Sequence, residues 1–99
     1  MRLLIVEPGY SPYIAHFKSA AEARERVIKG ESKILHPFDT DRIALICSAE
    51  QQNQAFNRQM DAGFCVYGRF YICGWDGKNE IELTKKQADR YFKKYVQPE

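Results

Sequence analysis

The sequence contains no apolar run long enough to cross a membrane, and none typical of a secretory leader. Its N-terminal apolar run extends only from Leu3 to Val6 before Glu7, Pro8 and Gly9 interrupt it. A membrane-spanning helix needs roughly 20 apolar residues, and a leader needs an apolar core followed by small residues at a cleavage site. We therefore expect a cytoplasmic protein without a membrane partner.

An excess of either charge is also absent. The 99 residues include 15 Lys and Arg against 13 Asp and Glu, which gives a formal net charge of +2. A protein that coats DNA, or that binds membranes through a polybasic segment, carries a larger positive excess, and an acidic DNA mimic carries the opposite sign. The total charge supports neither extreme.

Cysteine pairs of the kind that hold zinc are missing. Cys47, Cys65 and Cys73 are odd in number and contain no C-x-x-C pair, whereas zinc sites use closely spaced ligands. Each lies in an apolar run, where a reduced cysteine behaves as a small hydrophobic residue. We therefore expect no metal site, and we interpret His16 and His36 as sheet-edge residues.

Motifs for nucleotide binding and catalysis are absent as well. Gly74 and Gly77 belong to a turn and not to a glycine-rich loop that could cradle phosphate. A nucleophile pair of Cys47 and His36 is compatible with the sequence, but it lacks a flanking signature and a third group to orient the base. We expect no cofactor and no catalytic residue, so a small enzyme built on a cysteine or carboxylate ranks last.

The sequence does supply enough apolar material for one core. Hydrophobic residues make up 44% of the chain and aromatic residues 13%, and each aromatic side chain buries a large apolar area. The length suits a single domain, residues 1–99. Tight turns join several predicted strands, which favours an α+β fold: a mixed or mainly antiparallel sheet of about four to five strands with two helices packed on it.

The strand predictions follow short apolar runs bounded by turn residues. Gly68 divides the longest of them, so that segment is either one central strand or two strands. The polar, glutamine-rich segment 48–62 has no clear period and is predicted to be irregular, with one or two helical turns. A turn is predicted at 39–41. The predicted strands are 2–7, 13–17, 33–38, 42–47, 64–75 and 80–83.

Two capping boxes mark the predicted helices. Ser19 and Thr84 are each followed three residues later by Glu or Gln, the spacing that satisfies free amides at a helix start. Gly30 is expected to end the first helix in the left-handed conformation, and Pro98 ends the second. The second helix has an apolar face that is expected to cover the strand segment 64–75. This face consists of Ala88, Tyr91, Phe92, Tyr95 and Val96.

Aromatic residues also alternate along the segment 64–75. Tyr67, Tyr71 and Trp75, with Arg69 between them, have the pattern of a stacking surface for single-stranded nucleic acid. The same pattern suits a sheet face that the last helix covers. We favour the covered face.

Several short motifs occur together in a characteristic order. They are Glu7-Pro8-Gly9 after the first strand, Asn57-Arg58 after a polar stretch, Gly68 within the late strand, and Leu83-Thr84 followed by Gln87. In this arrangement the chain resembles domain-of-unknown-function family 3846, short proteins of bacteria, their phages and mobile elements. The resemblance covers nearly the whole chain, implies no established activity, and matches the family's characteristic asparagine to Asn57.

Asn57 and Arg58 are the leading candidates for a binding site. An asparagine can bond several backbone groups in a loop, and the planar fork of an arginine suits a carboxylate or a phosphate. The alternative is that Asn57 locks the loop while Arg58 pairs with an acidic neighbour. We favour this structural alternative.

The last helix also presents a basic face that could contact phosphates. The alternative is a solvated surface that keeps the domain soluble, which we favour because Asp89 and Glu99 dilute the charge. The candidate phosphate-contacting residues are Lys86, Arg90, Lys93 and Lys94, with Arg69 nearby.

Three classes of function remain open. The first is a non-catalytic module or modulator that binds another protein in phage or mobile-element biology. The second is a nucleic-acid-binding protein that uses the basic face of the last helix, and the third is a small enzyme. An exposed strand near Tyr13 or Lys33 could also pair two copies of the chain.

Overall fold

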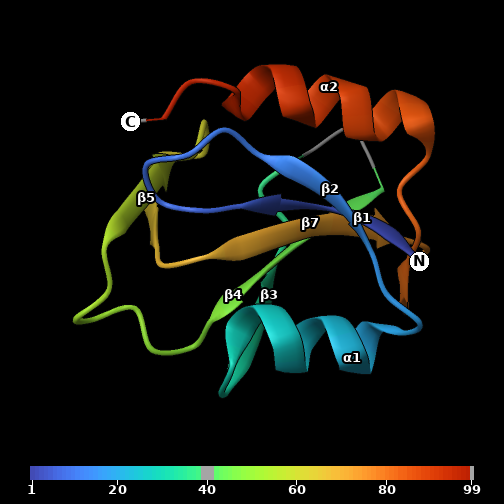
Figure 1. The fold of residues 1–99 in the computed structure, drawn as a ribbon, viewed down its shortest axis with the longest axis horizontal. Helices are drawn as coiled ribbons and strands as arrows, with labels where there is room; N and C mark the ends of the chain where they lie inside the picture. The colour runs from blue at the N-terminus through green and yellow to red at the C-terminus, as the bar shows by residue number, and fades with distance from the viewer. Residues whose placement is uncertain (39–41, 99) are drawn as a thin grey trace.

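The computed structural model describes residues 1–38 and 42–98 (Figure 1). Within them, a mainly antiparallel sheet carries one helical segment on each face, so the predicted α+β fold is confirmed. The predicted turn at 39–41 and the residue Glu99 lie outside the described part of the chain. None of the helices in the described part is long and apolar enough to span a bilayer.

The main sheet has the strand order β2-β1-β7-β4-β3, and the short β8 pairs with β7. All of its pairs are antiparallel. The central strand β7 therefore lies between β1 and β4, while β2 and β3 form the two edges. The strands are β1 (Arg2–Val6), β2 (Tyr13–His16), β3 (Ser32–Leu35), β4 (Ile43–Ser48), β7 (Phe70–Trp75) and β8 (Glu80–Ile81).

The segment 48–62 differs from its prediction. It contains a strand, β5 (Phe56–Gln59), that pairs with β6 (Cys65–Tyr67) in a second, two-stranded sheet. The two buried positions of β5, Asn57 and Arg58, are polar and adjacent, and the register of the pair shifts between Phe56 and Arg58. The segment therefore lacks the apolar alternation that would have indicated a strand. Gly68, with φ of +79°, separates β6 from β7, which confirms the two-strand alternative for 64–75.

The first helical segment consists of α1 (Ala20–Ala23) and a π-helical continuation, η1 (Arg24–Ile28). Ser19 Oγ accepts the Glu22 amide at 3.2 Å, as predicted, but the Glu22 carboxylate accepts the amide of Lys18 at 3.4 Å and so completes no capping box. The left-handed residue at the end is Lys29, with φ of 55°, and not Gly30. The wider π turn, in which the Lys29 amide bonds Arg24 O, moves the stop by one residue.

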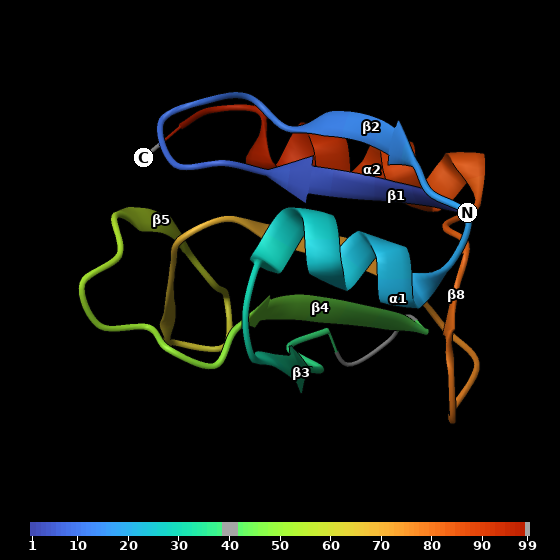
Figure 2. The same cartoon turned by 60° about the horizontal axis from the view of Figure 1, so that its bottom comes forward.

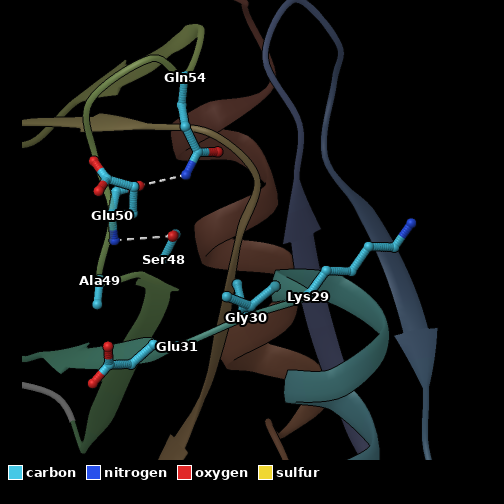
Figure 3. A pocket seen from close by; sticks show the side chains of 8 residues that line it. Lys29, Gly30, Glu31, Ser48, Ala49, Glu50 and Gln54 are labelled. Atoms are coloured by element: carbon cyan, nitrogen blue, oxygen red, sulfur yellow. Dashed lines mark hydrogen bonds between the residues drawn. The ribbon is translucent and has the colours of Figure 1, made fainter.

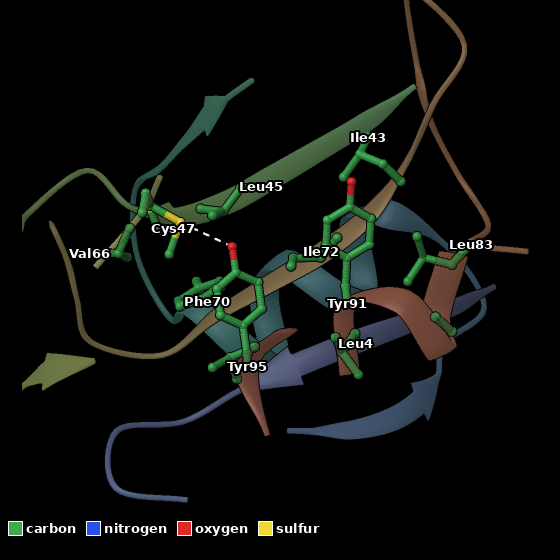
Figure 4. Close-up of a cluster of buried hydrophobic side chains, with 13 residues drawn as sticks. Leu4, Ile43, Leu45, Cys47, Val66, Phe70, Ile72, Leu83, Tyr91 and Tyr95 are labelled. Carbon is green, nitrogen blue, oxygen red and sulfur yellow. Dashed lines mark hydrogen bonds between the residues drawn. The ribbon is translucent and has the colours of Figure 1, made fainter. Parts of the chain in front are cut away.

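Helix α2 (Lys85–Tyr95) covers the opposite face of the sheet and begins with the predicted capping box at Thr84. Tyr91 and Tyr95 are buried against the sheet, and the rings of Tyr95 and Phe70 meet edge to face at 6.2 Å between centroids. Figure 4 shows these rings with Leu4 and Ile72 in one cluster. The expectation that α2 shelters the glycine-containing strand segment is confirmed.

The alternation of β7 assigns the other aromatic residues to the opposite face. Phe70 and Ile72 point toward α2, whereas Tyr71 and Cys73 belong to the core under α1 and η1, with Trp75 packed against them. The expected cover of Tyr71 and Trp75 by the last helix is therefore wrong. Successive residues of a strand point to opposite faces, so β7 contributes side chains to two separate cores, one on each face of the sheet.

Candidate functional site

The predicted binding pair lies inside the molecule. The side chains of Asn57 and Arg58 are both fully buried. Asn57 Nδ2 donates to Val6 O at 2.9 Å and to Gly68 O at 2.8 Å, and its Oδ1 accepts a bond from Arg58 Nη1 at 2.9 Å. Asn57 thus joins the end of β1 to the junction of β6 and β7, and any role in binding acts through the segments that it joins.

Arg58 connects the β1–β2 turn to the end of α2. Its Nη2 donates to Tyr10 O at 2.7 Å and to Tyr95 O at 2.9 Å. A second bond supports the same junction, because Ser11 Oγ donates to Val96 O at 2.8 Å. The guanidinium fork therefore fixes the position of the C-terminal end of α2 relative to the chain that leads into β2.

The predicted basic residues do not form one patch. Lys93 pairs with Asp89 at 3.2 Å, and Lys94 pairs with Asp61. Arg69 lies 4.0 Å from Glu7 and directly precedes β7, on the face opposite α2 by the alternation of that strand. The structure therefore leaves Lys86, Arg90, Lys93 and Lys94 together on α2 without Arg69.

Two of the three thiols are enclosed. Cys47 and Cys73 are buried, whereas Cys65 is exposed. Burial raises the pKa of Cys47, and burial together with the Glu80 carboxylate raises the pKa of Cys73. A raised pKa keeps a thiol protonated at neutral pH and unsuited to nucleophilic attack. Within residues 1–38 and 42–98, no group of three or more His, Cys, Asp and Glu side chains could hold a metal ion.

A buried ionic cluster that no sequence motif indicated lies beneath η1. The Glu80 side chain is only 2% exposed and pairs with Arg24 of η1. Tyr71 donates its hydroxyl to Glu80 at 2.8 Å, and Cys73 Sγ lies 3.8 Å from the same oxygen. These contacts raise the pKa of Tyr71, because burial and the nearby carboxylate both disfavour a phenolate. No local motif links residues this far apart in the sequence.

A second missed feature is a groove between β2 and α2. Figure 2 shows β2 at the outer edge of the sheet with α2 alongside. The groove has a volume of about 250 Å³. Its apolar residues are Ile14, Ala88 and Phe92, and its charged residues are Arg2, Lys85 and Asp89.

A larger depression of about 410 Å³ lies where the end of η1 meets the end of β4 (Figure 3). Three hydrogen bonds join polar groups of its lining. The Glu50 amide donates to Ser48 Oγ, Gln54 Nε2 donates to Glu50 O, and the Ala49 amide donates to Glu31 O. The groove between β2 and α2 is the stronger candidate because it borders an edge strand and has an apolar floor.

The comparison with known families agrees with the motifs. The family model named Domain of unknown function (DUF3846) matches residues 1–96 of the 99-residue chain. The chain belongs to this family, which confirms the resemblance drawn from the sequence. No curated protein and no solved structure matches the chain.

Proposed function

We propose that this domain is a non-catalytic protein-binding module that adds an extended segment of its partner to the outer edge of β2. The observation that carries the proposal is that the outer edge of β2 has no partner strand among the described residues. In the described part of the chain, β2 pairs only with β1 and ends the strand order. Addition of a strand at a free edge gives affinity through the main chain and specificity through alternate side chains.

The register identifies which backbone groups face outward. Met1 and Phe17 exchange both of their backbone bonds, at 2.7 and 3.0 Å. Bonded and non-bonded pairs alternate along an antiparallel ladder, and Arg2 pairs with His16 and Leu4 with Ile14. The N–H and C=O groups of Ile14 and His16 therefore point away from β1, toward the place where an added strand would bind.

The side chains near this edge are apolar and exposed. Tyr10 is 70% exposed, Tyr13 is 42% exposed and Ile14 is 41% exposed. The opposite edge, β3, also exposes Ile34, by 37%, but it carries the exposed and charged Lys33, which discourages pairing at an edge. The contrast favours β2 as the interaction edge.

The groove beside β2 is held at both ends. At one end, Arg58 and Ser11 join the β1–β2 turn to the C-terminal end of α2. At the other end, Arg2 Nη1 donates to Leu83 O at 2.9 Å, and the Leu83 amide donates to Arg2 O at 2.9 Å. A groove fixed in this way loses little conformational entropy when a partner binds.

The non-catalytic part of the proposal is supported by the burial of Cys47 and Cys73, which raises the pKa of both thiols and makes them poor nucleophiles. The setting follows from the resemblance described above, so the proposed partner is a protein of phage or mobile-element biology, or of the host cell. A module of this kind needs no cofactor.

A library of random dodecapeptides, selected on the immobilised full-length chain, tests the proposal. The decisive pair of variants is His16→Pro and His16→Ala. Proline removes the outward N–H without breaking a bond to β1 and is tolerated on edge strands, whereas alanine keeps the N–H. Loss of one backbone bond is expected to weaken selected peptides about fivefold or more in His16→Pro and to leave His16→Ala within about twofold of the parent.

Circular dichroism spectra must first show that both variants are folded. A failure to select any peptide, or equal binding by both variants, would contradict strand addition at β2. Sedimentation at high protein concentration tests whether a second copy of the chain binds at the edge instead. A dimer that forms with His16→Ala but not with His16→Pro would show that the edge binds a second copy, and it would also contradict the proposal.

Nucleic-acid binding is the second candidate, and the exposed α2 face favours it. Lys86 is exposed and makes no ion pair within residues 1–38 and 42–98. Binding through phosphates should weaken steeply with salt, and Lys86→Glu combined with Lys93→Glu should abolish it. A mobility-shift assay at low salt that shows no complex with single-stranded or duplex DNA or RNA would remove this candidate.

A further inference from the structure

We propose that the segment bound at β2 carries an apolar side chain and an acidic side chain two positions apart. The apolar side chain fills the groove between β2 and α2, and the carboxylate meets Lys85 and Arg2. This inference rests on the proposed function and specifies the chemistry of the partner. It is carried by the shape of the groove, the strand spacing and the distribution of charge.

The groove can take one side chain of an added strand. Ile14 faces the α2 side of the sheet because it pairs with Leu4, a member of the core under α2. Ala88 and Phe92 of α2, which are four residues apart and therefore on one side of the helix, complete the apolar lining. A strand laid along β2 points every second side chain to this face, so one of them enters the groove of about 250 Å³.

The next side chain on the same face meets a different environment. Residues two apart in a strand are separated by about 6.6 Å, and the position two residues from Ile14 is His16, opposite Arg2. Arg2 and Lys85 both border the groove at this end. The partner residue two positions from the apolar anchor therefore lies beside two cationic side chains.

The carboxylates near this end are already engaged. Asp89 pairs with Lys93 at 3.2 Å, and Glu82 accepts a bond from the Arg2 amide at 2.8 Å while lying 3.9 Å from the N-terminal amine. Lys85, in contrast, makes no ion pair or side-chain hydrogen bond with any residue that the structure describes. The positive end of the α2 dipole lies at the same place. Together these charges favour an acidic partner side chain.

Fluorescent octapeptides provide the test. Two probes place Glu two positions before or two positions after a single Leu in a threonine-rich frame, which covers both strand directions. Control peptides replace Glu with Gln or with Lys. Anisotropy titrations with the full chain should show that one Glu probe binds about threefold to fivefold more tightly than its Gln control, as expected for an exposed ion pair. The Lys control should bind more weakly than the Gln control.

Protein variants assign this preference to the groove. Lys85→Glu should remove the preference for Glu and should favour the Lys peptide, whereas Lys86→Glu makes the same change in net charge one residue away and should leave the preference unchanged. Phe92→Ala should weaken all peptides that contain Leu. An equal effect of Lys85→Glu and Lys86→Glu would contradict the inference.

The library selection separates the two levels of the proposal. Selected peptides that depend on the His16 N–H but show no acidic position, and bind Lys85→Glu as tightly as the parent, would overturn the inference and leave strand addition intact. Selected peptides that ignore the His16 N–H would overturn both.

Discussion

At the scale of single residues, Arg58 joins segments that lie far apart in the sequence. Its guanidinium is fully buried and donates to backbone oxygens of the β1–β2 turn and of the last residue of α2. Removal of the group takes its hydrogen bonds away from these oxygens and from Asn57 Oδ1, and a buried acceptor that loses its donor costs about 1–3 kcal/mol. We therefore expect Arg58 to contribute strongly to the free energy of unfolding, although it lies in a short strand.

We predict that Arg58→Ala lowers the free energy of unfolding by about 3 kcal/mol or more. The exposed Arg26 is the matched control, because Arg26→Ala removes the same side chain from the surface and should change stability by less than about 0.5 kcal/mol. Urea denaturation followed by fluorescence measures both variants. Similar midpoints for the two would contradict the structural role of Arg58.

The buried thiol of Cys73 makes a prediction about alkaline stability. Its pKa in the folded protein is raised above the ordinary value of 9.0, so above about pH 9 the unfolded chain binds fewer protons than the folded one. The free energy of unfolding then falls as pH rises, by up to about 1.4 kcal/mol per pH unit for each such group. Below pH 9 this contribution is fully present.

Denaturation curves at pH 8, 9 and 10 for Cys73→Ala and for Cys65→Ala, which alters the exposed thiol, test this point. The Cys73 variant should lose less stability than the parent between pH 9 and pH 10, and the Cys65 variant should follow the parent. Parallel pH profiles for all three proteins would show that the Cys73 thiol does not remain protonated in the folded state.

At the scale of elements, Glu80 joins two parts of the fold that share no sequence motif. It lies in β8, bonds Tyr71 of β7, and pairs with Arg24 of η1. Arg24 is 40% exposed whereas Glu80 is 2% exposed, so the carboxylate is the buried partner. The helical segment is thereby attached to the β7–β8 hairpin by an ionic contact in addition to its apolar packing.

We predict that Glu80→Gln destabilises the domain by about 2 kcal/mol, because breaking a buried ionic contact costs more than losing an exposed one. Glu25→Gln makes the same change at an exposed position of η1 and should have little effect. Hydrogen exchange should show faster opening of 24–28 in the Glu80 variant alone. Unchanged exchange in that segment would mean that apolar packing suffices to hold η1.

The elements also show what the sequence could predict. Strands β1, β4 and β7 and helix α2 follow local patterns of apolar residues and caps, and each was predicted within one or two residues, apart from the division of 64–75. Strand β5 was missed because its buried positions are polar. The π turn was missed because it extends a helix by one residue without a sequence signal.

At the scale of the whole molecule, the sequence correctly predicted two helices on a sheet, but the prediction that the last helix covers the face of Tyr71 and Trp75 was wrong. The order β2-β1-β7-β4-β3 is set by pairings between residues far apart in the chain, and this order assigns Tyr71 to one core and Phe70 to the other. The candidate site was hidden for the same reason. Ile14 and Phe92 are 78 positions apart in the sequence, and only the fold brings them to one groove.

The main sheet therefore has a core on each face, with one edge at β2 and the other, which carries Lys33, at β3. The proposed function depends on the β2 edge, which combines outward backbone groups, exposed apolar side chains and a bordering groove. The β3 edge also exposes Ile34 and borders a depression, but it carries the charged Lys33.

The most direct measurement is amide hydrogen exchange of β2, resolved by NMR, with and without a peptide selected on the full chain. The account predicts that the amides of Ile14 and His16 exchange rapidly in the free protein, while those of Tyr13 and Ala15, which face β1, are protected. The bound peptide should then slow the exchange of Ile14 and His16. Slow exchange of these two amides in the free protein, or no change on binding, would contradict the account.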